Sequence, residues 1–125
     1  MAGVKKILIV DDEVDFGKMV KLNLERTGEY QVMQETKGRN AVETAKAFMP
    51  DMIFLDVVMP EIDGGDVLAK LKDNAALKDI PVVFLTAIIT DKEASAGDGI
   101  VAGRPFLAKP VTTAKLIDCI KKYLK

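Results

Sequence analysis

A run of apolar residues that ends on a single acid constrains the fold more than any other part of the sequence. Residues 52–55 (MIFL) lead into Asp56, and a loop that contains Pro60 and Gly64 follows. A short, continuous apolar run of this kind is typical of a strand that is buried on both faces of a parallel sheet. The pattern therefore predicts that a buried strand carries Asp56 to one edge of a sheet.

Other segments of the chain read as strands that alternate with helices. The further strands are expected at residues 7–10, 30–35, 81–86 and 106–108, the second of them as an edge strand because it mixes polar and apolar side chains. Apolar residues at helical spacing predict helices around residues 16–24, 39–48, 67–71 and 116–124, the first through Phe16, Met19, Val20 and Leu24, with Gly28 as a left-handed cap. Alternation without a hairpin signal predicts an α/β fold, a doubly wound five-stranded parallel sheet with helices on both faces.

Composition limits the class of protein. The chain has 125 residues, 49% of them apolar, and 18 basic against 19 acidic residues, which suits one domain over residues 1–125. This balance lacks the basic footprint of a nucleic-acid-binding protein, so we expect no direct contact with nucleic acid. Apolar runs fall short of the ~20 residues that cross a bilayer, so we expect no membrane contact and a cytoplasmic location.

Cysteine and histidine usage narrows the possible chemistry. The chain has one cysteine, Cys119, which agrees with a reducing compartment and reads as a small apolar residue on the last helix. It has no histidine, which excludes serine–histidine–aspartate triads and imidazole metal sites. Any chemistry must therefore use carboxylates, hydroxyls, lysines or a bound metal.

The segment from Asp91 to Arg104 departs from the regular alternation. Gly97, Gly99 and Gly103 fall within it, and each glycine inside a helix costs about 1 kcal/mol relative to alanine. We therefore expect the fourth helix to be short, irregular or missing. A nucleotide-binding interpretation of these glycines is weak because the run precedes a strand and has the wrong spacing.

The polar residues that end the predicted strands form the candidate site. They are Asp11 and Asp12 after the first strand, Asp56 after the third, Thr86 after the fourth and Lys109 after the fifth. Ligands of an open parallel sheet bind beyond the carboxyl ends of its strands, so we expect these side chains to share one crevice. Converging carboxylates repel one another unless a cation lies among them. Oxygen ligands without histidine or cysteine favour Mg²⁺.

The lysine and the threonine complete a pattern suited to phosphoryl transfer. An ammonium and a hydroxyl opposite a metal can bind the oxygens of a phosphoryl group, and the Asp56 carboxylate can attack phosphorus to give an aspartyl phosphate. Each residue also has an ordinary structural explanation. Asp11 or Asp12 could cap the first helix, and the other three could cap a turn, end a strand or lie in a solvated loop. Their coincidence at the same end of four strands favours the site.

Four segments together resemble the receiver domains of two-component response regulators. They are residues 9–13 (IVDDE), 53–64 (IFLDVVMPEIDG), 83–87 (VFLTA) and 106–110 (FLAKP), in an order that spans essentially the whole chain. The resemblance implies a flavodoxin-like sheet with strand order 2-1-3-4-5, as in a chemotaxis receiver. It also implies a signalling receiver that catalyses only its own phosphorylation and dephosphorylation, and not a separate enzyme.

Carried over residue by residue, the resemblance implies a phosphorelay function. Asp56 would accept a phosphoryl group from a phosphohistidine on a histidine kinase or a histidine phosphotransfer protein. Asp12 and Asp56 would hold Mg²⁺ together with the backbone carbonyl of Val58, and Asp11 would act directly or through water. The output partner that responds to the phosphorylated form is not indicated by the sequence.

The same resemblance implies a conformational switch. Thr86 and Lys109 would bind the phosphoryl oxygens, and Lys109–Pro110 would be a cis peptide bond. Thr86 would move toward the new phosphate, and Phe106 would turn inward into the space that it leaves. Since Phe106 has no phenolic hydroxyl, its two rotamers should differ by packing and burial alone.

Two departures from the family pattern predict specific behaviour. The glycine-bearing residues 91–104 put the common output face in doubt and suggest adaptation to a particular partner. Val58 and Ile88, two residues after Asp56 and Thr86, are apolar where the family often has polar groups that place the hydrolytic water. We therefore expect a slowly hydrolysing aspartyl phosphate.

Three alternatives remain open at this stage. A carboxylate-based small-molecule phosphatase would also use Mg²⁺ but usually has an Asp-x-Asp motif and a cap domain, whereas Asp11 and Asp12 are adjacent. A pseudo-receiver that acts without phosphorylation typically loses the acceptor or the lysine, and this chain has both. The sequence does not distinguish a stand-alone regulator from the receiver of a hybrid histidine kinase.

Overall fold

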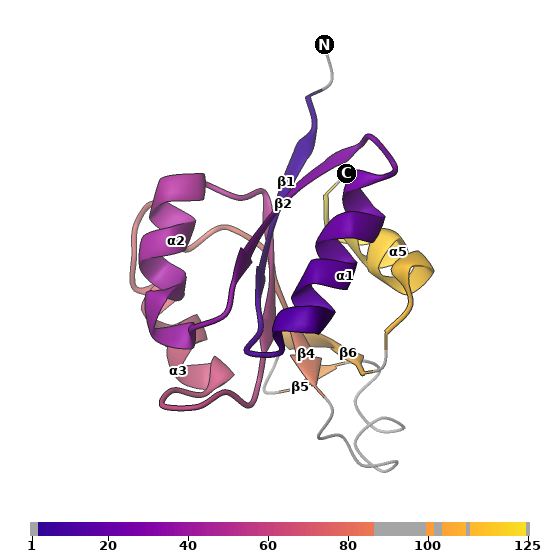
Figure 1. The fold of residues 1–125 in the computed structure, drawn as a ribbon. Coiled ribbons are helices and arrows are strands. Elements are labelled where there is room, and N and C mark those ends of the chain that lie inside the picture. The colour runs from indigo at the N-terminus through magenta and orange to yellow at the C-terminus, as the bar shows by residue number, and fades with distance from the viewer. Residues whose placement is uncertain (1–2, 87–99, 102–103, 110, 125) are drawn as a thin grey trace.

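A mainly parallel sheet lies at the centre of the computed structural model, with helices on either side of it (Figure 1). The structure describes residues 3–86, 100–101, 104–109 and 111–124. Its strands are β1 (Lys5–Val10), β2 (Tyr30–Glu35), β3 (Met52–Asp56), β4 (Val82–Thr86), β5 (Ile100–Val101) and β6 (Arg104–Ala108). They lie in the order β2-β1-β3-β4-β6-β5, so β2 is an edge strand as its mixed composition predicts.

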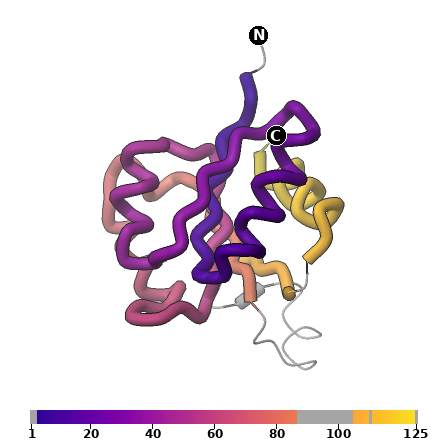
Figure 2. Tube along the Cα trace, viewed as in Figure 1, coloured from indigo at the N-terminus to yellow at the C-terminus, as the bar shows by residue number. Residues whose placement is uncertain are grey.

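Helices cover both faces of the sheet. Helices α1 (Val14–Glu25) and α5 (Thr113–Tyr123) lie together on one face, and α2 (Ala41–Phe48) and α3 (Gly64–Lys72) lie on the other (Figures 1 and 2). A 3₁₀ turn, η1 (Gly38–Asn40), precedes α2 directly. The side chains of Asp63 and Thr112 accept hydrogen bonds from the backbone N–H groups of Asp66 and Lys115, and so cap α3 and α5 at their N-termini.

The central strands carry continuous apolar runs because each of them packs against a helical layer on both sides. Along β1, Ile7 and Ile9 join the core under α1 and α5, whereas Leu8 and Val10 join the core under α2 and α3. All four side chains are fully buried. The alternation of successive residues between the two faces explains why the sequence shows a continuous apolar run and not an alternating one.

The structure confirms the predicted fold class, the flavodoxin-like topology and the strand order 2-1-3-4-5, whose fifth strand is β6 in Figure 1. All strand pairs from β2 to β6 are parallel. It adds the two-residue strand β5, which is antiparallel to β6 and pairs Val101 with Arg104. The absence of a hairpin signal was therefore misleading, because two residues among glycines are too few for a recognisable pattern. The expected irregular fourth helix falls mostly on residues 87–99 and 102–103, outside the described residues.

Two details of α1 differ from the sequence prediction. Met19 does not belong to the buried face, because 43% of its surface is exposed, whereas Gly17, Val20 and Leu24 are buried. Gly17 packs against the Gln34 side chain of β2, which would have to move to make room for a Cβ at this position. Gly28 has the expected left-handed conformation, with φ of 78°, but it lies beyond the actual C-cap residue, Arg26.

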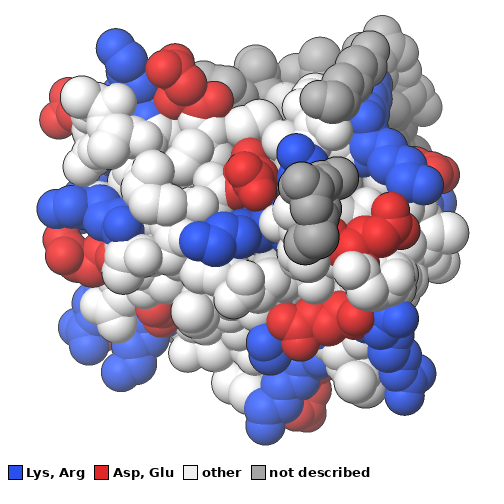
Figure 3. Space-filling model, turned by 90° about the horizontal axis from the view of Figure 1, so that it is seen from above, with Lys and Arg blue, Asp and Glu red and all other residues white. Residues whose placement is uncertain are grey.

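The surface carries charges of both signs. On the face seen in Figure 3, Lys and Arg side chains are interspersed with Asp and Glu side chains. Within the described part of the chain, no helix has the length and apolar character that a membrane span requires.

Candidate functional site

The register of the sheet brings the ends of four strands to one edge. Val10 pairs with Leu55 across β1 and β3, Asp56 with Leu85 across β3 and β4, and Thr86 with Ala108 across β4 and β6. The next residues in the chain after β1 and β6 are Asp11 and Lys109. A backbone hydrogen bond of 2.9 Å from Lys109 N to the Thr86 carbonyl fixes the last of these strand ends. Parallel pairing therefore gathers the polar residues that the sequence singles out.

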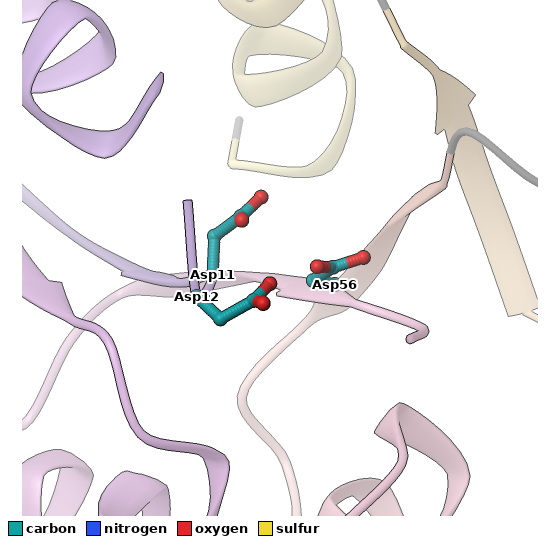
Figure 4. A group of neighbouring side chains, drawn as sticks. All are labelled: Asp11, Asp12 and Asp56. Carbon is teal, nitrogen blue, oxygen red and sulfur yellow. The ribbon is translucent and has the colours of Figure 1, made fainter. Parts of the chain in front are cut away.

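Three carboxylates form a cluster at this edge. Asp11, Asp12 and Asp56 each offer one oxygen, and these oxygens lie within 4.8 Å of one another. Figure 4 shows Asp11 and Asp12 leaving the end of β1 and the Asp12 and Asp56 carboxylates pointing toward a common space. Asp11 is fully buried and Asp56 is 5% exposed, whereas Asp12 is partly exposed. The cluster is thus sunk into the edge of the sheet and open to solvent on the Asp12 side.

Lys109 supplies the positive charge of the site. Its Nζ lies 2.7 Å from Asp11 Oδ2 and 3.8 Å from Asp56 Oδ2. Only 10% of the Lys109 side chain is exposed. Burial alone would lower the pKa of the ammonium, but hydrogen bonds to Asp11 and Glu13 raise it above its usual value. Lys109 is therefore a permanent cation of the site at neutral pH.

Two contacts of Lys109 are not among the sequence predictions. Glu13 Oε1 accepts a hydrogen bond of 2.5 Å from Lys109 Nζ, and the Phe16 ring centroid lies 4.7 Å from the same nitrogen. Glu13 follows the acid pair directly in the sequence, but nothing in the sequence indicates that it meets a lysine 96 residues away. Phe16 reads only as an apolar residue of the first helix.

The acids of the cluster are poorly neutralised. Burial, followed by the charge of Asp11, raises the pKa of Asp56 to about 7, and Lys109 offsets only part of that shift. Burial also raises the pKa of Asp11 despite the hydrogen bond from Lys109. One ammonium beside two buried carboxylates and a partly exposed one leaves an excess of negative charge at the edge of the sheet.

This donor set fits a hard divalent cation. Asp11 Oδ2 is buried and lies 2.7 Å from the Lys109 ammonium, which also contacts Glu13 and lies near Asp56. One ammonium does not balance the charge of these carboxylates, and a divalent cation among them would remove the excess. Three carboxylates without sulfur or imidazole are the ligands that Mg²⁺ prefers.

The loop after β3 closes tightly against the strand end. Gly64 N donates a 2.7 Å hydrogen bond to the Val57 carbonyl, and an added Cβ on Gly64 would lie 2.6 Å from the Asp56 carbonyl oxygen. Val58 N lies 3.3 Å from Asp56 Oδ1 and donates to it, while 51% of the Val58 surface is exposed. The loop therefore fixes the Asp56 carboxylate through the Val58 N–H group and leaves the Val58 side chain exposed to solvent.

A second segment supports the same loop from the side of η1. An added Cβ on Gly38 would lie 2.7 Å from the Ile62 side chain and 2.9 Å from that of Met59, so these side chains would have to move to accept a larger residue. Arg39 and Glu61 form an ion pair of 3.3 Å. Glu61 has φ of 71°, a left-handed conformation that a side chain seldom adopts. The η1 turn thus braces the loop that carries Val58.

The predicted switch residues are both buried. Thr86 is 2% exposed at the end of β4, and Phe106 is 8% exposed on β6, in the core under α2 and α3. Phe84 and Phe106 pair across the two strands. Ile88 and Pro110, including the predicted cis peptide bond, lie outside the described residues. Thr86 thus lies at the edge of the sheet that carries the acid cluster. Phe106 lies on the neighbouring strand, two residues before Ala108, which pairs with Thr86.

The structure does not support the ordinary explanation that Asp11 or Asp12 caps the first helix. The N-cap residue of α1 is Glu13, and its side chain makes no capping hydrogen bond. Asp11 Oδ1 accepts a 2.9 Å hydrogen bond from Glu13 N, which leaves Oδ2 directed at Lys109.

Cys119 is buried as expected, and burial raises the pKa of its thiol to about 11, which makes it unreactive.

Comparison with known proteins gives a consistent result. The model of the family described as response regulator receiver domain matches residues 7–121. The chain is 32% identical over 122 residues to the polar-differentiation response regulator DivK of Brucella ovis. The aligned residues cover 96% of each chain.

Solved structures agree with the family match. The chemotaxis protein CheY4 of Vibrio cholerae superposes with a TM-score of 0.83 at 27% identity, over 98% of this chain and 100% of that one. The signal receiver domain of a signal transduction histidine kinase from Syntrophus aciditrophicus superposes with a TM-score of 0.79 at 34% identity, over 97% of this chain and 90% of that one. The chain therefore belongs to the response regulator receiver domain family of two-component systems, a family of signalling modules.

Proposed function

We propose that the chain is a phosphorylation-switched receiver that accepts a phosphoryl group on Asp56 from a phosphohistidine of a partner protein. The observation that carries this proposal is the set of charged groups around Asp56. One of its carboxylate oxygens lies within 4.8 Å of an oxygen of Asp11 and of Asp12, and Oδ2 lies 3.8 Å from the Lys109 ammonium. A carboxylate in such a setting can act as a nucleophile toward phosphorus, with a cation on each side of the transferred group. The partner would be a histidine kinase or a histidine phosphotransfer protein.

The transfer step follows from these groups. An Asp56 carboxylate oxygen attacks phosphorus, an O–P bond forms, and the P–N bond to the donor imidazole breaks. The imidazole leaves with the electron pair and takes up a proton. Because these 125 residues contain no histidine, the donor imidazole lies outside them. Lys109, held beside Asp56 by the end of β6, would bind a terminal oxygen of the arriving group.

The acid cluster would hold Mg²⁺ through Asp11, Asp12 and Asp56, with the backbone carbonyl of Val58 as a further ligand. When bound, the ion would neutralise charge on the transferring phosphoryl oxygens. The raised pKa of Asp56 supports this assignment, as does the sharing of the Lys109 ammonium between Asp11, Glu13 and Asp56, since both indicate unbalanced negative charge. Asp12, the partly exposed acid, would give the ion its route from solvent.

The output would arise at β4 and β6. We propose that the Thr86 hydroxyl moves to bind a phosphoryl oxygen, and that Phe106 responds by a change of rotamer. Both side chains are buried, and the backbone bond between Lys109 and Thr86 links the two strand ends. A buried aromatic side chain repacks between discrete positions, which gives a switch and not a graded response. An output protein would recognise the altered surface.

The phosphorylated form would be long-lived. Val58 exposes 51% of its surface beside Asp56 and offers no polar atom on its side chain to position a water molecule. Hydrolysis would then depend on water that the protein does not orient.

The organisation of the chain fits two kinds of receiver. We propose that residues 1–125 form one receiver domain. DivK of Brucella ovis is a response regulator, and the Syntrophus protein is the receiver of a histidine kinase. Both are similar to this chain over most of its length, so either a separate regulator or a hybrid-kinase receiver agrees with the resemblance.

Titration with beryllofluoride, a phosphoryl mimic, tests the proposal. Amide NMR spectra of the wild type in Mg²⁺ should show saturable shifts at Asp56, Thr86, Phe106 and Lys109, and the Asp56→Asn variant should show none. A pseudo-receiver would give no specific shift in either protein. A small-molecule phosphatase would instead release inorganic phosphate from phosphomonoesters in repeated turnovers.

A further inference from the structure

Glu13 makes a contact with Lys109 that bears directly on the proposed reaction. Lys109 Nζ lies 2.5 Å from Glu13 Oε1 and 2.7 Å from Asp11 Oδ2, but 3.8 Å from Asp56 Oδ2. The ammonium is therefore hydrogen-bonded to Glu13 and lies beyond hydrogen-bond distance of the phosphoacceptor. A phosphoryl group on Asp56 would need a share of the same three N–H donors.

We propose that Glu13 is a positioning residue that holds Lys109 in a resting position and so lowers the affinity of the site for a phosphoryl group. This inference rests on the proposed function. Asp11 is buried and fixed by the hydrogen bond that its Oδ1 accepts from Glu13 N, whereas 61% of the Glu13 side chain is exposed. Glu13 is thus the contact that Lys109 can give up when a phosphoryl oxygen arrives.

The local structure makes Glu13 suitable for a substitution. It is the N-cap residue of α1, but its side chain makes no capping hydrogen bond, so its replacement removes no cap. The Phe16 ring centroid lies 4.7 Å from the Lys109 ammonium, and this cation–π contact should help to keep the lysine at the site after Glu13 is changed. The effect of a substitution should therefore fall on the position of the ammonium.

Three variants separate the contact from the charge. Glu13→Gln removes the charge and keeps the shape, and Glu13→Asp keeps the charge but shortens its reach. Asp15→Asn removes one negative charge from the exposed first turn of α1, two residues away. Since Asp is favoured at an N-cap position, the Glu13→Asp carboxylate would also turn toward the helix backbone and away from Lys109.

Beryllofluoride affinity in Mg²⁺ is the first measurement. Both Glu13 variants should bind beryllofluoride about two- to fivefold more tightly than the wild type, the range expected for a partly exposed ion pair. Asp15→Asn should match the wild type closely at physiological salt. Equal affinities in all four proteins, weaker binding by the Glu13 variants, or a wild-type affinity for Glu13→Asp would overturn the inference.

NMR of the lysine side-chain ammonium groups without beryllofluoride is the second measurement. The Lys109 signal should change in both Glu13 variants and stay unchanged in Asp15→Asn. An unchanged Lys109 signal in Glu13→Gln contradicts the resting contact whether or not the chain is phosphorylated. A second outcome separates the two proposals. If the Lys109 signal changes in the Glu13 variants but the wild type does not bind beryllofluoride, the proposed function is overturned, and with it the claim about phosphoryl affinity.

Discussion

The Lys109 ammonium lies 3.8 Å from Asp56 Oδ2, near enough for attraction but too far for a hydrogen bond. Lys109 is directed at Asp11 and Glu13 instead. Asp56 consequently remains an under-neutralised carboxylate in a buried position, with a pKa of about 7. In the proposed function, the arrangement that makes Asp56 a costly anion also favours its reaction with a phosphoryl group and its binding of a metal ion.

Replacement of this anion should stabilise the metal-free protein. Folding raises the pKa of Asp56 from 3.8 to about 7, so the folded state binds more protons between these values and the free energy of unfolding falls as pH rises. Asp56→Asn mimics the protonated acid, and its advantage should grow from near zero at pH 4 to about 1–4 kcal/mol at pH 8. Urea unfolding in EDTA at both pH values measures this difference. An advantage that is equal at both pH values would contradict the account.

Binding of Mg²⁺ should release a proton near neutral pH. The ion binds the ionised carboxylate, so below pH 7 its apparent affinity should fall by about tenfold per pH unit and level off above pH 7. Calorimetric titration in two buffers with different ionisation enthalpies counts the proton. Asp12→Asn should weaken binding of Mg²⁺ but retain proton release, since Asp56 is unchanged. An affinity that does not depend on pH between 6 and 8 would contradict an Asp56 that has to lose a proton before it binds Mg²⁺.

The strand ends could be predicted from sequence because their signals are local. An apolar run followed by an acid or a lysine identifies a buried strand and its carboxyl end, and parallel pairing then places Asp11, Asp56, Thr86 and Lys109 together without further information. The fold class follows from the alternation of strands and helices in the same way. The roles of these residues in catalysis and metal binding stay predictions.

The contacts between side chains of different segments could not be predicted. Glu13 and Phe16 meet Lys109 only because the packing of α1 places its first turn beside the end of β6. Met19 looked like a core residue because methionine is apolar, but Gly17 takes the buried position against Gln34. Such choices depend on shape complementarity, which hydrophobic periodicity does not encode.

The two adjacent glycines at the start of α3 should differ in their tolerance of alanine. A Cβ on Gly64 would lie 2.6 Å from Asp56 O and 2.8 Å from Val57 Cα, both backbone atoms that cannot easily move, so Gly64→Ala should cost about 1–3 kcal/mol. Gly65→Ala meets only the Asp63 carboxylate at 3.2 Å and should change stability by less than about 1 kcal/mol. Denaturant unfolding compares the two. Similar losses for both variants would show that the Gly64 contact does not hold the loop.

A polar side chain at position 58 should shorten the life of the aspartyl phosphate. Val58→Asn would place an amide beside Asp56 that can orient water, and we expect hydrolysis to become about tenfold faster or more. Because 51% of Val58 is exposed, its unfolding free energy should change by no more than about 0.5 kcal/mol. Val4→Asn, at another exposed valine near the start of β1, serves as the control. A wild-type half-life of seconds, or no acceleration in Val58→Asn, would contradict the proposal of slow hydrolysis.

Covalent phosphorylation of Asp56 is the central claim, and intact-protein mass spectrometry after incubation with acetyl phosphate and Mg²⁺ tests it most directly. The wild type should gain the mass of one phosphoryl group, lose it on alkaline treatment, and fail to gain it in EDTA. The Asp56→Asn variant should keep its original mass under all of these conditions. A wild type that stays unmodified, or an Asp56→Asn variant that is modified to the same extent, would contradict the assignment of Asp56 as the phosphoacceptor.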